Sequence, residues 1–376
     1  MKIIVASDSF KGSLTSREVA AAAVRGIRQV LPICELVGVN VADGGEGTMD
    51  AIVEVLGGEM VTITARDPLG RPVSVRYGIA GKTAIIDMAT ASGLTLLMNE
   101  ERNPWLTSTY GTGEMILDAI GRGCRDFLVG IGGSATNDAG MGMLQALGFR
   151  FYDIDDQEII DGCGGRLQDV ARIDDTVVMD AVRQCRFTVA CDVDTPFCGS
   201  EGAAYVFAPQ KGADMEMVAR LDSGMVSFAK VIEKTYGIDV TSMAGAGAAG
   251  GMGGGFYAFL NATLKRGVDM VLDAIDFDSI IRGADLVITG EGTIDYQTVK
   301  GKTAAGVLAR AKAQDIPVVA IAGRVEMCDS VAQMGFAGVY PIMENEMPLA
   351  EAMQPDFATA NVEKTVKKIV TNLHIS

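Results

Sequence analysis

The chain has 376 residues, of which 48% are hydrophobic, and a formal net charge of -16 at pH 7. These values exclude a largely disordered chain and allow two ordinary domains with substantial cores. The acidic balance also excludes nucleic acid and anionic membranes as main partners, because both require a basic face.

The first residues, MKIIVASDSFKG, contain only a brief apolar stretch, and no later run is long and apolar enough to span a bilayer. The seven cysteines form no CxxC pair, and the one histidine, His374, lies close to the carboxyl terminus. We therefore expect a cytoplasmic protein with reduced thiols. Its general base should be Asp, Glu or Lys, because histidine-dependent triads and zinc sites need an internal histidine.

Both ends of the chain alternate short apolar runs with helical stretches. The predicted strands are 2–7, 34–42, 284–290, 316–323 and 337–343, and the predicted helices are 15–31, 47–57, 302–314 and 357–373. Thr15 or Ser13 can cap the first helix. This βαβα order is typical of a parallel sheet with helices on both faces.

The middle of the chain has a different pattern. Residues 59–89 alternate like antiparallel strands joined by a turn at Asp67 to Gly70. A helix at 112–122, a strand at 126–133, a long helix from about 137 and glycine-rich stretches follow. The predicted fold class is α/β, with a Rossmann-like parallel-sheet domain (1–64 plus 284–376) into which a mixed α/β domain (65–283) is inserted.

Acidic residues follow several of the predicted strands. Asp8 and Lys11 follow the first strand, and Asp43 and Glu46 lie in a glycine-rich turn, VADGGEGT. A partial echo, ITGEGTID at 288–295, brings Glu291 and Asp295 after a later strand. Carboxyl ends of parallel strands share one edge of the sheet, so these acids are expected together, facing a cation or substrate hydroxyls.

Three glycine-rich segments are candidates for phosphate contact. The strongest, GIGGSATND, leads from a strand into a predicted helix capped by Ser134, Thr136 or Asn137, and its backbone can cradle phosphates. It and 243–260 both match G-x-G-x-x-G/A, the dinucleotide fingerprint, and for the first match Asp153 or Asp155 lies near the ribose-binding distance. The glycine density of 243–260 indicates backbone flexibility or close ligand approach more than packing.

The third segment, VKGKT, is no P-loop, because Tyr296 stands where that motif needs glycine, although Lys300 and Lys302 can meet phosphates at the start of the helix. Asp192 and Asp194 follow a further strand, and Lys211 lies downstream of them. Paired carboxylates after a strand suit metal binding or proton abstraction. Acids at strand ends, lysines near helix starts and glycine loops together suit phosphoryl transfer.

Seven blocks carry a family resemblance over the whole chain. They are VASDSFKGSLTS, VADGGEGT, TSTYGTGEMI, GIGGSATNDAGMGMLQALG, DVDTPFCGSEGAAYVFAPQKGA, GAGAAGGMGGG and ITGEGTIDYQTVKGKT, and they resemble the bacterial type 1 glycerate kinases. Ser7 replaces an expected proline and Thr195 an expected asparagine, and neither change removes an ionisable group. The resemblance implies ATP-dependent phosphorylation of D-glycerate with Mg2+, giving 2-phosphoglycerate in glyoxylate and sugar-acid catabolism.

The resemblance places the active site in the cleft between the two domains, with small-molecule partners only, and a homo-oligomer is compatible with it. We expect Asp43, Glu46, Glu291 and Asp295 to bind Mg2+ or glycerate hydroxyls, with Asp43 and Glu291 as metal ligands. Lys11 should face the substrate carboxylate or the phosphoryl group. Asp192 is the first choice for the general base and Asp8 the second. Gly132, Gly133 and Ser134 should cradle the ATP phosphates, with Lys211 neutralising them.

Three alternatives are weighed against this reading. A 3-phosphoglycerate-forming glycerate kinase would use the same site. A nicotinamide-dependent oxidoreductase of a small hydroxy acid would use the two fingerprint matches, although neither lies in an amino-terminal βαβ unit. A non-catalytic sensor of sugar acids or nucleotides would need an output domain, and no segment predicts one.

Overall fold

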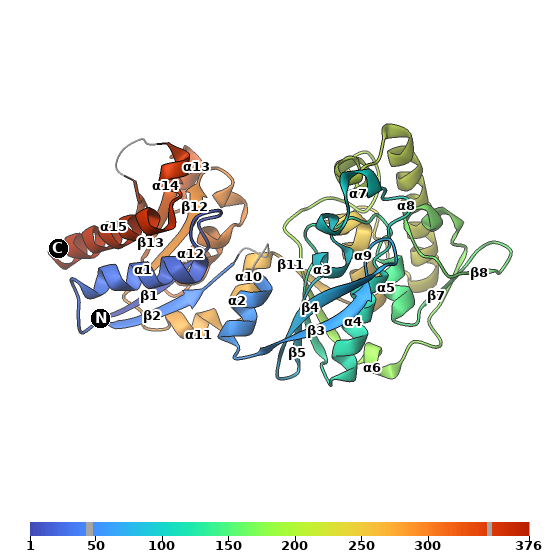
Figure 1. Cartoon of the computed structure of the whole chain (residues 1–376), viewed down its shortest axis with the longest axis horizontal. Coiled ribbons are helices and arrows are strands. Elements are labelled where there is room, and N and C mark those ends of the chain that lie inside the picture. Colours follow the sequence, from blue (N-terminus) through green and yellow to red (C-terminus); the bar gives the residue numbers. More distant parts are fainter. Residues whose placement is uncertain (43–47, 344–347, 376) are drawn as a thin grey trace. The chain divides into compact units, whose positions relative to one another are not determined.

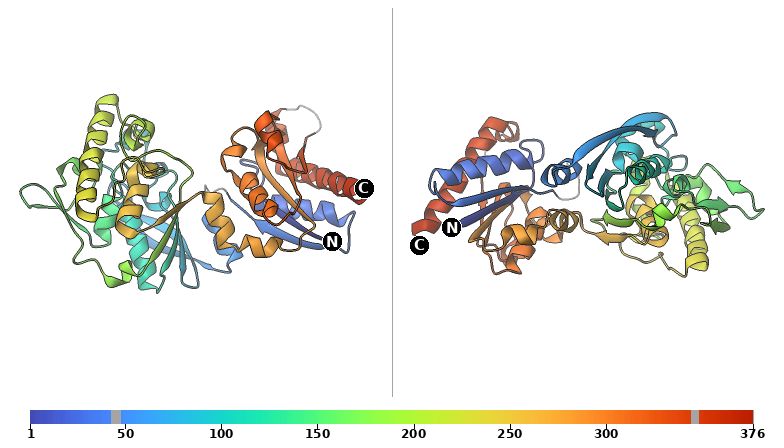
Figure 2. Two further views of the ribbon diagram at one scale, coloured as in Figure 1. Left: turned by 180° about the vertical axis from the view of Figure 1, so that it is seen from behind. Right: turned by 90° about the horizontal axis from the view of Figure 1, so that it is seen from below.

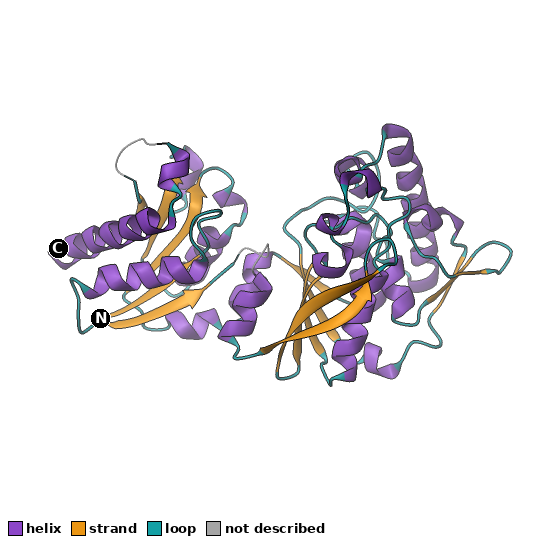
Figure 3. Ribbon diagram, viewed as in Figure 1, coloured by secondary structure: helices purple, strands orange, loops and turns teal. Residues whose placement is uncertain are grey.

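The computed structural model describes residues 1–42, 48–343 and 348–375. The chain divides into two compact units, the parallel-sheet unit (Met1–Val55 with Val268–Ser376) and the inserted unit (Leu56–Gly267), shown in Figure 1. Both units combine strands with packed helices (Figure 3). The predicted α/β class, with a parallel sheet in one part and a mixed sheet in the other, is confirmed.

The parallel-sheet unit is built on five parallel strands in the order β14-β13-β12-β1-β2. Their bounds are β1 Lys2–Ser7, β2 Glu35–Asn40, β12 Leu286–Ile294, β13 Val318–Val325 and β14 Gly338–Pro341. From β1 the chain goes first to β2 on one side and later to β12 on the other. The order therefore reverses between β1 and β12, and ligands of open α/β sheets bind at the carboxyl ends of strands at such a point.

Helices cover this sheet for reasons visible in the sequence. Helix α1 (Ser16–Arg28) begins at a capping box, in which the Thr15 side chain accepts from Glu18 N and the Glu18 carboxylate accepts from Thr15 N. It packs beside α15 (Pro355–Ile375), as both views of Figure 2 show. Gly26 permits this contact, because a Cβ there would lie 2.5 Å from the Glu363 carbonyl oxygen. Apolar residues of α1, α15 and the sheet form one buried cluster.

The remaining helices of this unit are α2 Thr48–Val55, α10 Gly267–Ala274, α11 Phe277–Ile281, α12 Thr303–Lys312, α13 Asp329–Gln333 and α14 Leu349–Ala352, with a 3-10 turn at Thr298–Lys300. Helix α12 packs against β12 and β1. Its position brings its first turn to the carboxyl end of β1.

The inserted unit contains a six-stranded sheet in the order β11-β10-β6-β5-β4-β3. Its strands are β3 Glu59–Arg66, β4 Pro72–Ala80, β5 Thr83–Asp87, β6 Asp126–Gly130, β10 Arg186–Ala190 and β11 Thr263–Lys265. β5, β6, β10 and β11 are parallel, and β4 and β3 are antiparallel, as predicted for 59–89. The predicted turn is stabilised by Asp67, whose Oδ1 accepts from Leu69 N and Arg71 N.

A small antiparallel sheet, β8-β7-β9, lies in the same unit, with strands β7 Arg150–Tyr152, β8 Glu158–Ile159 and β9 Arg172–Asp174. The helices of the unit are α3 Ala89–Ser92, α4 Tyr110–Gly121, α5 Met141–Ala146, α6 Asp180–Arg183, α7 Ala203–Phe207, α8 Met215–Tyr236 and α9 Ala248–Leu260. In the described parts of the chain, no helix has the length and apolar composition needed to cross a membrane.

Candidate functional site

Asp8 and Glu291 lie side by side at the reversal point of the parallel sheet. The register pairs Ser7 of β1 with Gly290 of β12, so the two acids occupy the next position on neighbouring strands. Asp8 N donates to the Gly290 carbonyl at 2.9 Å. Both acids are buried, with 7% and 5% of their surfaces exposed. Two predicted site residues that lie far apart in the sequence are thus brought together.

The Asp8 carboxylate is held by hydrogen bonds on both oxygens. Oδ1 accepts from Ser9 N at 2.6 Å, and Oδ2 accepts from the Thr303 hydroxyl at 2.7 Å. Thr303 is the first residue of α12, so this bond ties the start of that helix to the end of β1. Sequence reasoning missed Thr303, although its place just after Lys302 at a predicted helix start was a usable signal.

Glu291 differs from its neighbour because one of its oxygens is unpartnered. Oε2 lies 3.7 Å from Lys302 Nζ, whereas buried Oε1 has no hydrogen-bond partner in the described structure. Burial raises the pKa of Glu291 to about 7, opposed in part by Lys302 and Thr298. A buried carboxylate oxygen without a donor is costly in a finished core, so Oε1 is suited to receive a donor from a ligand.

The echo segment, 288–295, is not the turn that the sequence predicted. β12 continues to Ile294, because it pairs with β13 as far as Ile294 and Val325. Glu291 therefore lies on the strand, and Asp295 follows it and forms a turn in which its Oδ1 accepts from Gln297 N at 2.8 Å. Asp295 is close enough to raise the pKa of Glu291 further.

The other acids and the lysine predicted for this edge are only partly described. A Cβ on Gly292 would lie 3.6 Å from Lys11 N, so the Lys11 backbone runs beside β12 just after Glu291. The Lys11 side chain is exposed. Asp43 and Glu46 lie outside the described residues.

The predicted phosphate loop follows β6 in the inserted unit. Gly132 and Gly133 are exposed and Ser134 is buried. Within the described residues, no protein acceptor takes up the backbone N–H groups of these three residues. A Cβ on Gly132 would meet nothing within 4 Å, and Gly133 has a φ of 71°. Exposed N–H groups beside open space are the arrangement that binds anions.

Lys211 lies behind this loop. Its Nζ donates to Ser134 Oγ at 2.7 Å and to the Thr136 carbonyl at 2.6 Å, and the residue is only 1% exposed. Burial lowers the pKa of Lys211 to about 7, which nearby Asp138 opposes. In this structure the ammonium therefore supports the loop from inside.

The helix predicted to start at about 137 is shorter and starts later. α5 begins at Met141, after Ala139 and Gly140 with φ of 52° and 77°, which a right-handed helix cannot contain. The cause is Asp138, a buried carboxylate that the sequence analysis did not single out. Its oxygens accept from Thr109 N and Oγ1 at 2.8 Å and from the N–H groups of Gly140 and Gly142 at 3.2 Å. Burial raises the pKa of Asp138, and these bonds oppose the rise.

These positions do not support the dinucleotide fingerprints. After Gly130, Gly132 and Ala135 the chain forms a loop where the motif requires the start of a helix. The second match, in 243–260, follows turns rather than a strand.

The second glycine-rich stretch is explained by packing, contrary to the preference for flexibility. A Cβ on Gly250 would lie 2.1 Å from the Thr136 carbonyl oxygen, and one on Gly255 would lie 2.3 Å from the Ala139 carbonyl oxygen. The start of α9 thus lies against the back of the phosphate loop, where side chains do not fit.

Asp192 lies on the same edge of the six-stranded sheet as the phosphate loop. β10 pairs Ala190 with Gly130 of β6, so both strands end together. Asp192 is exposed, and its Oδ1 accepts from Gly267 N at 2.9 Å. The inserted unit therefore brings together Gly132, Gly133, Ser134 and Lys211, with Asp192 just after the neighbouring strand β10.

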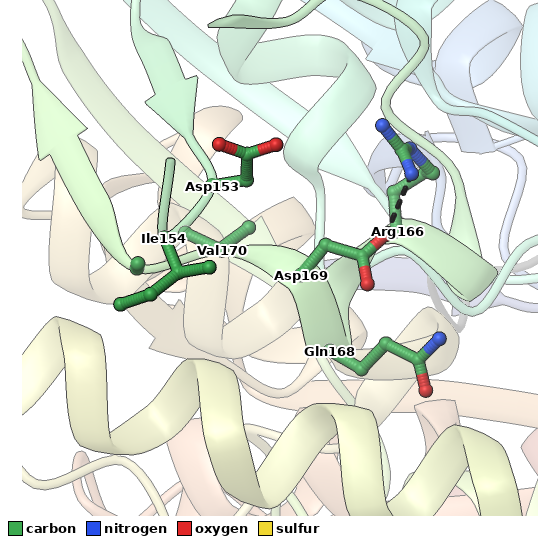
Figure 4. A pocket seen from close by; sticks show the side chains of 7 residues that line it. Asp153, Ile154, Arg166, Gln168, Asp169 and Val170 are labelled. Carbon is green, nitrogen blue, oxygen red and sulfur yellow. Dashed lines mark hydrogen bonds and ion pairs between the residues drawn. The ribbon is translucent and has the colours of Figure 1, made fainter. Parts of the chain in front are cut away.

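A pocket of about 540 Å3 opens elsewhere, beside the small antiparallel sheet (Figure 4). Asp153, Arg166 and Asp169 are among its lining residues, and Arg166 pairs with Asp169 at 2.6 Å. The Asp153 Oδ1 accepts from Asp155 N and Gln157 N in a local turn. None of the predicted catalytic residues lines this pocket, so its hollow shape alone does not make it the site.

The arrangement of the described side chains also bears on metal binding. Across residues 1–42, 48–343 and 348–375, no group of three His, Cys, Asp or Glu side chains could hold a metal ion. The seven cysteines are free.

The chain is similar to glycerate kinases over essentially its full length. The model of the glycerate kinase family matches residues 3–374. The chain is 45% identical to a glycerate kinase of Bacillus subtilis (strain 168) and 42% identical to a glycerate 2-kinase of Escherichia coli (strain K12), each match covering 100% of this chain and 98% of the relative. A crystal structure from Salmonella typhimurium LT2, described as glycerate kinase 2, is similar with a TM-score of 0.90 and 42% identity, covering 100% and 98% of the two chains.

Proposed function

The chain belongs to the glycerate kinase family and is a phosphotransferase, and we propose that it transfers the γ-phosphoryl group of ATP to the 2-hydroxyl of D-glycerate. The products are 2-phospho-D-glycerate and ADP. The full-length similarity to a relative named glycerate 2-kinase supports this regiochemistry most directly. ATP as donor implies a cytoplasmic reaction.

The phosphate loop is the proposed site of the ATP phosphates. Gly132, Gly133 and Ser134 offer backbone N–H groups that no described residue accepts, and these can donate to phosphate oxygens. Lys211 adds positive charge behind the loop and fixes the Ser134 hydroxyl. Lys211 is thus proposed to position the loop that binds the phosphates, without contacting the phosphates itself.

The acids at the reversal point of the parallel sheet are the proposed site of glycerate. Glu291 offers a buried acceptor for a substrate hydroxyl, and Asp295 lies near it. Asp43 and Glu46 stay a prediction for the same task. Lys11, whose backbone runs beside β12, is proposed to face an anionic group.

Mg2+ brought by ATP usually keeps several waters and needs only one or two carboxylates besides phosphate oxygens, so the lack of a three-acid group in the described parts is compatible with it. Asp43 stays the predicted ligand. Glu291 fits hydroxyl binding better than metal binding, because Lys302 Nζ lies 3.7 Å from its Oε2 and would repel a divalent ion. When bound, Mg2+ would neutralise charge on the phosphates.

Asp192 is the proposed acceptor of the hydroxyl proton, and Asp8 is the alternative. The glycerate oxygen attacks the γ-phosphorus, the bond to the ADP oxygen breaks, and the hydroxyl proton passes to the carboxylate. Both Asp8 oxygens already accept hydrogen bonds from the protein, whereas Asp192 is exposed on the edge that carries the phosphate loop.

Phosphorus NMR of the product formed from ATP, Mg2+ and D-glycerate tests the function. We expect the signal of 2-phosphoglycerate. A 3-phosphoglycerate signal would support the alternative regiochemistry, and no phosphoglycerate would contradict the proposal. Asp192→Asn and Asp8→Asn then distinguish the bases: the true base should lose turnover by about 100-fold or more, with ATP affinity nearly unchanged.

A further inference from the structure

Lys302 has no assigned role in the reaction. It lies at the reversal point of the parallel sheet, next to the buried Glu291 and at the start of α12. It is the residue that precedes the first turn of α12, a helix of ten residues. Its Nζ lies 3.7 Å from Glu291 Oε2, and its side chain is 34% exposed. It therefore joins the buried acid to a surface that a ligand can reach.

The start of α12 is not capped by a side chain. Lys302 makes no side-chain hydrogen bond to the first turn. The first N–H groups of a helix carry partial positive charge and bind anions when no cap accepts them. Thr303 donates its hydroxyl to Asp8 Oδ2, and both Thr303 and Ala304 are fully buried, so the group that a ligand can reach at this helix start is the Lys302 side chain.

Glu291 supplies the second, independent sign of a ligand. Its Oε1 is buried and unpartnered, although the residue is only 5% exposed. A dianionic phosphate carries hydrogen-bond acceptors and no donor, so it cannot satisfy Oε1 of the ionised Glu291 carboxylate. A hydroxyl can donate to Oε1, and the group that suits the adjacent ammonium and helix terminus is an anion.

A cation beside a buried acceptor matches one chemical class, a hydroxy acid. We propose that Lys302, at the start of α12, binds the carboxylate of a hydroxy acid, while Glu291 Oε1 accepts a hydrogen bond from a hydroxyl that is not phosphorylated, in glycerate the 3-hydroxyl. This inference rests on the proposed function and names the residue that distinguishes glycerate from uncharged polyols.

The test compares Lys302→Met with the parent enzyme in steady-state kinetics. Met preserves the length of the side chain and removes the charge. We expect the KM for D-glycerate to rise at least tenfold, and the KM for ATP to stay within threefold. Lys302→Arg, which keeps the charge, should stay within about threefold of the parent in both.

Lys312→Met is the matched control, because Lys312 lies on the last turn of the same helix and donates to the Met334 carbonyl. It should resemble the parent. Calorimetric titration of each variant with D-glycerate in the absence of ATP should reproduce the order of the KM values, and thermal unfolding should show that all variants are folded.

Several results would overturn the inference. An unchanged KM for D-glycerate in Lys302→Met would do so, as would a rise in the KM for ATP alone, which would assign the anion site to phosphate. Equal losses in Lys302→Arg and Lys302→Met would show that the charge is not what matters. If the parent and Lys312→Met do not phosphorylate D-glycerate at all, the proposed function fails, and calorimetry still tests the binding site.

Discussion

Lys211 in the inserted unit and Glu291 in the parallel-sheet unit are both buried ionisable residues, but their hydrogen bonding differs. The Lys211 ammonium donates to two oxygens of the phosphate loop, whereas one Glu291 oxygen has no partner in the described structure. A satisfied buried charge stabilises one conformation of its surroundings, and an unsatisfied one carries a cost that a ligand can remove. The comparison therefore separates a residue that shapes a site from a residue that contacts the substrate.

Glu291→Gln tests the residue whose carboxylate oxygen has no hydrogen-bond partner in the described structure, and it should have the largest effect on activity. The amide is a weaker acceptor than a carboxylate, so kcat/KM for D-glycerate should fall roughly 10- to 100-fold, corresponding to about 1.5–3 kcal/mol. The free energy of unfolding should change little, because Gln loses the ion pair with Lys302 but also removes the cost of burying a charge. Steady-state kinetics and chemical denaturation measure the two effects. A destabilised variant with full activity would assign Glu291 to architecture.

Lys211→Met tests the satisfied member. The substitution leaves Ser134 Oγ and the Thr136 carbonyl without their buried donor. At pH 9, where the contribution of Lys211 is largely present, we expect the free energy of unfolding to fall by about 1–3 kcal/mol and the KM for ATP to rise, because the loop is less fixed. Denaturation in urea and kinetics with varied ATP check this. Unchanged stability with a raised KM for ATP would instead indicate direct contact between Lys211 and phosphate.

The pH dependence of stability sharpens the same contrast. The pKa of Lys211 is lowered from 10.5 to about 7, so between these values the unfolded chain binds more protons than the folded one. The contribution of Lys211 to the free energy of unfolding should therefore rise with pH from 7 toward 10.5, by at most about 1.4 kcal/mol per pH unit, and be lost as the pH falls through 7. Denaturation at pH 7, 8 and 9 should show this rise in the parent and in Lys312→Met. A rise that persists in Lys211→Met would contradict its assignment.

The smallest expected effect is the difference in stability between alanine substitutions at two neighbouring glycines of the phosphate loop. A Cβ on Gly132 meets nothing within 4 Å, so Gly132→Ala should leave stability within about 0.5 kcal/mol while obstructing the approach of phosphate and raising the KM for ATP. Gly133 has a φ of 71°, and Gly133→Ala should cost about 1 kcal/mol in stability. Denaturation and ATP kinetics of both variants are the measurement. Equal stability losses would mean that the backbone conformation of Gly133 is not the cause.

Much of the parallel-sheet unit was predictable because its signals are local. The capping box at Thr15 and Glu18 involves residues three apart, and the apolar runs of β1, β12 and β13 are contiguous. The acids after β1 and on β12 could be assigned to one sheet edge, since parallel strands end together. The extent of β12 could not, because pairing with β13 extended it through Glu291.

The sequence by itself determined the alternation of elements, the acidic character of the strand ends and the glycine-rich loop. Only the tertiary structure decided which charges are satisfied. Asp138 delays the start of α5 to Met141, because Thr109, 29 residues away, donates to its carboxylate. Glu291 lies beside Asp8 through strand register and beside Lys302 through the packing of α12 on the sheet. The physical reason is that periodicity and capping depend on near neighbours, whereas burial and hydrogen bonding of a charge depend on residues distant in sequence.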